Sequence, residues 1–164
     1  MLHIRALTGT DSLEDLTELL HRAYARLGAM GLNYTSVDQP VETTARRIAG
    51  GRCFVAELEG QVVGTAVVRP PYDENECEVF TRPGVASVQQ FGVDPPAQGR
   101  GVGRALLDAC EQWARERGFV ELALDTAEQA EHLVSLYTRL GFRPVGHVQW
   151  TGKVYRSVVL SKAL

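Results

Sequence analysis

The chain has 164 residues, 45% of them hydrophobic and 23% charged, which is typical of a globular protein that buries a core without cross-links. Its 17 basic and 20 acidic residues give a formal net charge of -3 at pH 7, which argues against nucleic-acid binding through bulk charge. A chain of this length fits one domain, which we expect over residues 1–164. No apolar run is long enough to cross a membrane, so we expect no membrane contact.

The cysteines and the N-terminal segment indicate the compartment. Cys53, Cys77 and Cys110 are odd in number and form no CxxC pair, which argues against a disulfide framework or a zinc site. The first residues, MLHIRALTGTDSLEDL, lack the long apolar segment of a signal peptide. We therefore expect a cytoplasmic protein whose cysteines stay reduced.

The first part of the chain predicts a strand, two helices and a loop. LHIRAL alternates apolar and polar residues and predicts a strand over 2–7. Residues 10–30 begin with capping residues and continue with leucines at helical spacing, which predicts a helix. A loop follows over 31–40, and a short helix over 41–50 ends at two glycines.

The middle of the chain predicts a hairpin, a strand and the strongest helix. Residues 53–69 read as two strands joined by a Glu-Gly turn. A polar connection over 72–84 follows, in which we expect a short strand around 76–80. Residues 86–93 predict another strand, and an apolar stripe predicts a helix over 101–118.

The last part predicts a strand over 119–126, a helix over 131–141 and strands over 142–150 and 153–163. The order is thus β-α-α-β-β-β-α-β-α-β-β. A hairpin that leads into alternating strands and helices predicts an α/β fold with a mixed sheet rather than a purely parallel one. We expect a central twisted sheet of about six to seven strands, flanked by about four helices.

Glycines stand at the start of the strongest predicted helix, in the stretch VDPPAQGRGVGRALLD. Gly99, Gly101 and Gly103 weaken a helix by ~1 kcal/mol each relative to alanine. No Ser, Thr, Asp or Asn stands close before Val102 to cap the free N–H groups of the first turn. Those donors, the helix dipole and neighbouring arginines predict an anion site made largely of backbone.

Three phosphate-binding patterns compete for this stretch. A Walker loop requires a lysine after the glycines, and none is present. A dinucleotide fingerprint requires a third glycine where Arg104 stands. The pattern [RQ]xxGx[GA] fits QGRGVG, residues 98–103, at every fixed position.

With these residues the chain resembles the GNAT N-acetyltransferase superfamily. FGVDPPAQGRGVGRALLDACEQWARERG is similar to its coenzyme A motif, and SLYTRLGF matches its helix ending LYxxxGF. The likeness in motifs covers about residues 53–162. It implies a GNAT-like fold and a transferase that uses acetyl-coenzyme A (acetyl-CoA) as cosubstrate and requires no metal.

The resemblance also implies which residues hold the coenzyme. The pyrophosphate would lie on the backbone amides of the glycine loop, and the pantetheine arm would pair with the edge of the preceding strand as an added strand would. These candidate coenzyme-binding residues are Phe91, Gly92, Val93, Gln98, Gly99, Arg100, Gly101, Val102, Gly103 and Arg104.

Catalytic candidates follow from the same resemblance. Tyr137 matches the family tyrosine near the thioester sulfur, where a phenol can donate a proton to the leaving thiolate. Ala130 departs from the asparagine that the family often has seven residues before that tyrosine. Asp125 and Glu78 are both candidates for the general base, and each is otherwise a solvated carboxylate or a local cap.

The resemblance implies direct attack of an amine on the acetyl group in a ternary complex, with a backbone N–H near Val93 stabilising the oxyanion. The acceptor is a primary amine of a small molecule or peptide, in a pocket shaped by about residues 24–39, with Tyr24, Asn33, Tyr34 and Asp38 as candidate lining. The alternative function is a non-catalytic acyl-CoA sensor, and a weaker alternative is a nicotinamide-dependent enzyme. A homodimer is compatible with the family.

Overall fold

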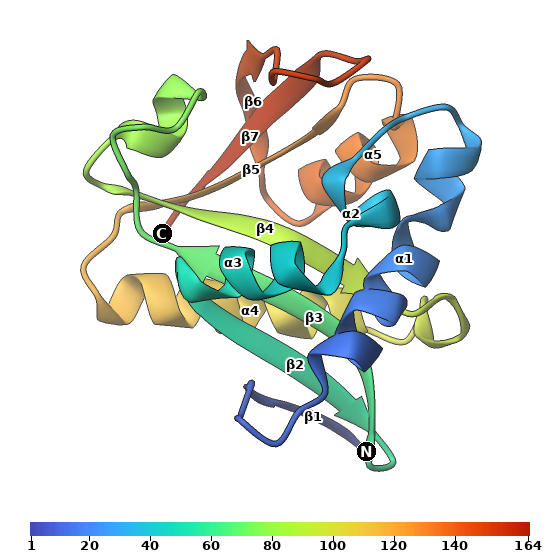
Figure 1. Cartoon of the computed structure of the whole chain (residues 1–164). Helices are drawn as coiled ribbons and strands as arrows, with labels where there is room; N and C mark the ends of the chain where they lie inside the picture. Colours follow the sequence, from blue (N-terminus) through green and yellow to red (C-terminus); the bar gives the residue numbers. More distant parts are fainter.

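The computed structural model describes all residues, 1–164, and is built on one seven-stranded sheet. The strand order is β1-β2-β3-β4-β5-β7-β6, and every neighbouring pair is antiparallel except β4 with β5 (Figure 1). The fold is therefore the predicted mixed α/β arrangement. The strands are β1 (Leu2–Ala6), β2 (Arg52–Leu58), β3 (Gln61–Arg69), β4 (Val85–Val93), β5 (Glu121–Ala127), β6 (Arg143–Val148) and β7 (Ser157–Ala163).

Five α-helices cover the sheet. The three that precede β2 lie on one face and α4 lies on the opposite face, while α5 stands beside β5 (Figure 1). They are α1 (Leu13–Ala29), α2 (Thr35–Asp38), α3 (Val41–Ala49), α4 (Val102–Glu116) and α5 (Glu131–Arg139). Two short 3-10 helices, η1 (Glu78–Thr81) and η2 (Pro95–Ala97), flank β4.

Two connections differ from the sequence-based expectation. The expected strand around 76–80 is wrong, because the backbone coils into η1 there. The Asn75 side chain accepts a hydrogen bond from the Cys77 N–H at 2.8 Å, and the Phe80 N–H reaches the Cys77 carbonyl at 3.0 Å. These local bonds replace strand pairing. The loop expected over 31–40 contains the short helix α2.

The opening between β4 and β5 creates the site. The two strands pair in parallel only from Val85 to Ser87, opposite Glu121 to Ala123. Beyond this point β4 carries an irregularity against β3, and Gln90 has a positive φ of 53°. A bulge of this kind increases local twist and turns a strand away from its neighbour. The carboxyl ends of β4 and β5 are therefore left unpaired with each other.

Glycines let helices approach the sheet closely on both faces near this opening. A Cβ on Gly92 would lie 3.0 Å from the Cβ of Ala23 in α1. A Cβ on Gly64 would lie 3.0 Å from Leu106 and Val102 of α4. Gly92 thus serves close packing, whereas the irregular backbone of β4 is at Gln90.

The largest core cluster fixes α4 against the sheet. Its 18 buried residues include Val68, Leu122 and Leu160 from the strands and Leu106 and Cys110 from the helix. Burying a leucine or valine side chain completely contributes about 1.5–3 kcal/mol. All three cysteines are buried and free.

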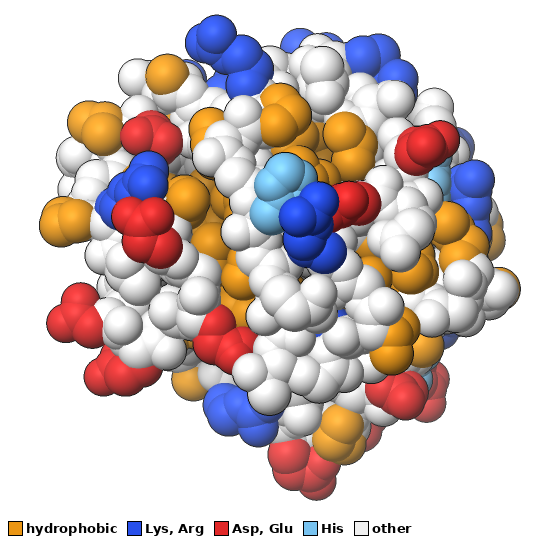
Figure 2. All heavy atoms as spheres, turned by 90° about the horizontal axis from the view of Figure 1, so that it is seen from above, with side chains coloured by type: hydrophobic (Ala, Val, Ile, Leu, Met, Phe, Trp, Pro, Cys, Tyr) orange, Lys and Arg blue, Asp and Glu red, His pale blue; other side chains and the backbone are white.

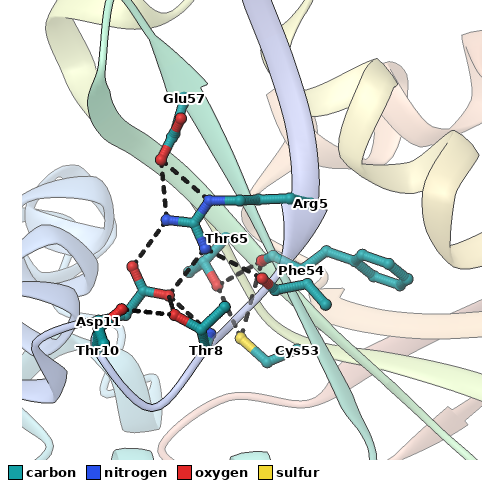
Figure 3. A network of polar contacts seen from close by, with 9 residues as sticks. Arg5, Thr8, Thr10, Asp11, Cys53, Phe54, Glu57 and Thr65 are labelled. Atoms are coloured by element: carbon teal, nitrogen blue, oxygen red, sulfur yellow. Dashed lines mark hydrogen bonds and ion pairs between the residues drawn. The ribbon is translucent and has the colours of Figure 1, made fainter.

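A polar network closes the other edge of the sheet. Arg5 of β1 uses all five of its N–H donors, on Asp11, Glu57 and the carbonyl of Ala6, at 2.8–3.0 Å (Figure 3).

The surface seen from above intersperses basic and acidic side chains with apolar ones, without a continuous patch of one sign (Figure 2). None of the helices combines the length and the apolar character needed to span a bilayer.

Candidate active site

A cleft of about 940 Å³ occupies the opening between β4 and β5. Its floor follows β4 from Ser87 to Val93, and its two ends differ in construction. The end beside Val93 is formed by the glycine loop before α4, and we call it the coenzyme end. The end beside Ser87 is formed by side chains of α3, β5 and the β6–β7 loop, and we call it the acceptor end.

The N-terminus of α4 carries free backbone donors. Gly101 precedes the helix with a left-handed φ of 82°, and no side chain caps it. None of the six N–H groups from Gly99 to Arg104 donates a hydrogen bond within the protein. In α1, by contrast, the Ser12 hydroxyl accepts from the Asp15 N–H at 3.1 Å. The free donors and the helix dipole make this end suitable for an anion.

Each glycine of the loop has its own physical reason. Gly99 and Gly101 have φ values of 77° and 82°, which L side chains rarely adopt, and a Cβ on either would meet no atom within 4 Å. Gly103 is instead restricted by space, since a Cβ there would lie 3.3 Å from the Phe91 ring. Arg104 lines the cleft, whereas Arg100 does not.

The edge of β4 presents backbone groups to the cleft. The Asp94 N–H bonds to Val63 of β3 at 2.8 Å, so by ladder alternation the backbone groups of Val93 face away from β3. The Val93 carbonyl accepts from the Gln98 side chain at 3.1 Å. The Phe91 carbonyl accepts from the Tyr24 hydroxyl at 2.7 Å. Gln98 therefore ties the strand edge to the loop.

Tyr137 lies between the two ends. It comes from α5, is 7% exposed, and its ring centroid lies 6.3 Å from that of Phe91. Its hydroxyl makes no hydrogen bond within the protein, although the residue lines the cleft. Burial raises its pKa well above 10, so the phenol keeps its proton at neutral pH. A protonated donor with no internal partner suits the role of a general acid.

The two candidate bases are in different positions. Asp125 of β5 lines the cleft, and its Oδ2 accepts from the Trp150 indole N–H at 2.8 Å. Burial raises its pKa, because removal from water disfavours the charged carboxylate. Glu78 lies outside the cleft, with its side chain 79% exposed and paired to Arg82 at 3.1 Å. The structure therefore does not bring Glu78 to the site, because η1 turns it to solvent.

Aromatic side chains form one wall of the acceptor end. The rings of Tyr34 and Tyr155 stack with centroids 5.0 Å apart, and Tyr24 lies 5.7 Å from Tyr34. The Tyr34 hydroxyl accepts from the Ala127 N–H at 2.8 Å and lies 2.7 Å from Thr126 Oγ1. These bonds hold the segment before α2 against the end of β5.

The expected acceptor residues are brought to the cleft only in part. Tyr24 and Tyr34 line it, but Asn33 and Asp38 do not. Sequence reasoning missed the residues that other elements supply to this end. No group of three His, Cys, Asp or Glu side chains lies together as a set of metal ligands. The missed residues are Arg47, Trp150, Lys153 and Tyr155.

The comparison with protein families decides the class. A model of the Acetyltransferase (GNAT) family matches residues 13–142. The chain belongs to the GNAT acetyltransferase family. It is therefore an N-acetyltransferase, as the names of its relatives also indicate. The match ends before β6, so the loop that carries Trp150 and Lys153 lies outside the part shared with the family model.

Two curated GNAT relatives and one solved structure are informative. S-(2-succino)cysteine N-acetyltransferase of Bacillus subtilis is 27% identical over 157 residues, covering 92% of this chain and 90% of that protein. Aminoglycoside N(6')-acetyltransferase type 1 of Stenotrophomonas maltophilia is 35% identical over 130 residues, covering 77% and 82%. A putative acetyltransferase from Salmonella typhimurium, solved with its cofactor acetyl-CoA, has the same fold (TM-score 0.73, 21% identity, covering 100% and 94%).

Proposed function

We propose that this GNAT protein transfers the acetyl group of acetyl-CoA to a primary amine of a small molecule or peptide, by direct attack in a ternary complex. The observation that carries the proposal is the run of free N–H groups from Gly99 to Arg104, opening onto a cleft. These donors suit a pyrophosphate, as one anion among many that a helix N-terminus binds. Family membership and the acetyl-CoA bound to the Salmonella relative support acetyl-CoA as the donor.

The residues along the cleft have complementary roles in this proposal. The N–H groups from Gly99 to Arg104 hold the pyrophosphate, Gln98 fixes the loop to β4, and Phe91 to Val93 hold the pantetheine arm along the β4 edge. The Arg100 side chain does not line the cleft, so in this proposal the residue contributes its backbone N–H rather than its guanidinium. We assign the thioester to the region between Val93 and Tyr137. In this proposal the Val93 N–H, which faces away from β3, stabilises the developing oxyanion.

The chemical step requires two proton transfers. The neutral amine attacks the acetyl carbonyl carbon to form a C–N bond and a tetrahedral oxyanion, which then collapses with cleavage of the C–S bond. Tyr137 donates its proton to the departing thiolate. Asp125 accepts the proton that the amine releases, directly or through water. Both groups line one cleft, so positioning contributes a large part of the rate.

A thermal-shift series with acetyl-CoA, CoA, NAD and ATP tests the coenzyme end. A ligand at 100 times its Kd adds ~2.7 kcal/mol. For a chain of this length, that amounts to about 5–10 °C in Tm. We expect this shift with both CoA forms and none with NAD or ATP. Stabilisation by NAD alone would exclude the assignment of the glycine loop to CoA.

Release of free thiol from acetyl-CoA tests turnover. The amine panel contains amino acids, their amides, polyamines, an N-terminal peptide, S-(2-succino)cysteine and an aminoglycoside, the last two being acceptors named for relatives. Direct transfer predicts intersecting initial-velocity lines, whereas an acetyl-enzyme predicts parallel ones. CoA binding without thiol release from any amine would favour the acyl-CoA sensor instead.

A further inference from the structure

Arg47 brings an unpaired cation to the acceptor end. It projects from α3 into the lining of the cleft and forms no ion pair. Its Nη1 donates to the Ser36 hydroxyl at 3.2 Å and to Gln39 Oε1 at 3.0 Å, both neutral acceptors. These two bonds fix the guanidinium. Its Nε and Nη2 groups have no partner in the protein, and neither is fully buried.

The contrast with Arg5 shows that this arrangement is not the chain's usual one. Arg5 directs all five donors to protein acceptors, including the carboxylates of Asp11 and Glu57 (Figure 3). Arg5 thus serves structure alone. In Arg47 the edge of the guanidinium formed by Nε and Nη2 stays free. A carboxylate can bind this edge with two parallel hydrogen bonds.

Lys153 adds a second cation at the same end. Its Nζ donates to the Asn33 carbonyl at 2.7 Å and to the Thr35 hydroxyl at 2.9 Å, again neutral groups. Asn33 also holds the loop, bonding Gly152 O at 2.9 Å and the Val154 N–H at 3.0 Å. One ammonium N–H is left for a ligand. Burial lowers the pKa values of both Lys153 and Arg47, as expected for cations without a carboxylate partner.

The charge of the cleft differs from that of the whole chain. The net charge is -3, yet six basic and only two acidic side chains line the cleft. At the acceptor end, Glu76 is exposed and accepts from the Thr151 N–H at 3.0 Å. Asp125 comes from β5 and is less exposed, so it is the acidic group that we assign to the amine. The lining residues counted are Arg22, Arg26, Arg47, Arg104, Arg139, Lys153, Glu76 and Asp125.

We propose that the acceptor is a small amine that also carries a carboxylate, as a free amino acid does, and that Arg47 and Lys153 hold this carboxylate while the amine faces Asp125. The inference rests on the proposed function and narrows its substrate class. The Arg47 guanidinium and the Lys153 ammonium have no carboxylate partner within the protein, so both can bind the carboxylate of a substrate. The same two cations repel a polycation such as an aminoglycoside. A peptide N-terminus carries an amide in place of this carboxylate.

The test compares each free amino acid with its primary amide and its decarboxylated amine. We expect kcat/KM for at least one amino acid to exceed that of its amide by about 30-fold, since charge-assisted bonds are stronger than neutral ones. In Arg47→Gln, KM for that amino acid should rise about 30-fold and the preference over the amide should largely disappear. KM for acetyl-CoA should not change.

Arg46→Gln is the matched control, because it removes one positive charge from an exposed position of the same helix that does not line the cleft. It should keep the preference for the acid. If Arg47→Gln does not fold, Lys153→Gln and the acid-to-amide ratio of the parent protein provide the same test. Equal rates for acids and amides, preference for the aminoglycoside, or equal losses on both forms in Arg47→Gln would overturn the inference.

Failure of the proposed function has a different signature. If no amine releases thiol, or if CoA does not stabilise the protein, the proposed acetyl transfer fails and the acceptor class fails with it. Thiol release restricted to amines without a carboxylate leaves the proposed function intact and overturns the inference alone. A preference for acids that Arg46→Gln reduces as much as Arg47→Gln would also overturn it, because bulk charge would then explain the effect.

Discussion

The two ends of the cleft are built from different parts of the chain. At the coenzyme end the functional groups are consecutive backbone N–H donors, from Gly99 to Arg104, held open by two left-handed glycines. At the acceptor end they are side chains from separate elements: Arg47 of α3, Asp125 of β5 and Lys153 of the β6–β7 loop. Only the coenzyme end lies wholly within the residues that match the GNAT family model.

In the proposed function, this difference allows a common donor and a variable acceptor to share one fold. The backbone site binds the coenzyme, which is the same whatever the acceptor, and this binding depends on loop geometry rather than on side-chain identity. A side-chain site can be altered one residue at a time without disturbing that loop. The two ends should therefore respond independently to substitution, and the following experiments test that independence.

The largest effect is expected at the coenzyme end, from Gly101→Asp. The new carboxylate would lie among the free N–H donors and repel a pyrophosphate, so we expect Kd for CoA to rise about 1000-fold, or ~4 kcal/mol. Space is available for the side chain, so the fold should persist with a modest loss of Tm from the positive φ. Isothermal titration and thermal unfolding measure both quantities.

Gly101→Asn is the matched control for this substitution. Asparagine has the same shape, tolerates a left-handed φ and carries no charge. We expect it to weaken CoA binding by no more than about tenfold, because the donors stay free. Unchanged CoA binding in Gly101→Asp would mean that the pyrophosphate does not lie on this loop.

Tyr137→Phe should affect catalysis and little else. Its hydroxyl has no partner in the protein, so removing it should leave Tm and Kd for CoA nearly unchanged. If it protonates the thiolate, kcat should fall about 100-fold or more, as is typical for loss of a general acid. Since burial raises its pKa well above 10, the parent rate should not decline at mildly alkaline pH through loss of this proton.

Asp125→Asn separates the base from the structural role of the same residue. Asparagine can still accept from the Trp150 indole, but it cannot take a proton from the amine, so kcat should fall by about 100-fold. In the parent protein kcat should decrease as the pH is lowered through the raised pKa of Asp125. If kcat of Asp125→Asn still decreases as the pH is lowered, that decrease belongs to another titratable group.

The substitution Asp125→Asn should raise the free energy of unfolding at neutral pH. Burial raises the folded-state pKa of this carboxyl above its unfolded value, so the charged form costs stability above that raised pKa. The variant should therefore unfold at a higher temperature than the parent at neutral pH. The gap should narrow as the pH falls through the folded pKa towards about 3.9, where the carboxyl of the unfolded chain is protonated too. A lower Tm for the variant at neutral pH would contradict the desolvation argument.

The same contrast explains what could be predicted from sequence. The glycine loop could be identified because its donors are consecutive, and the order of strands and helices because apolar periodicity is local. The acceptor end could be predicted only in part. Tyr24, Tyr34 and Asp125 line the cleft. Arg47 and Lys153, however, are ordinary surface residue types in their own segments and come to one cleft only in the fold. The structure places Glu78 outside the cleft for a related reason: nothing in the sequence before β4 indicates that η1 turns this side chain to solvent.

The smallest effect is expected from Tyr34→Phe, which tests whether the acceptor wall influences the coenzyme end. The change removes the acceptor of the Ala127 N–H and the partner of Thr126, which should cost about 1–3 kcal/mol of stability. Stacking on Tyr155 is retained, so KM for the acceptor should rise only about threefold to tenfold. Kd for CoA should stay constant, because the glycine loop makes no contact through this hydroxyl. An equal loss at both ends would show that β5 couples them, and the division into a fixed and a variable end would then no longer hold.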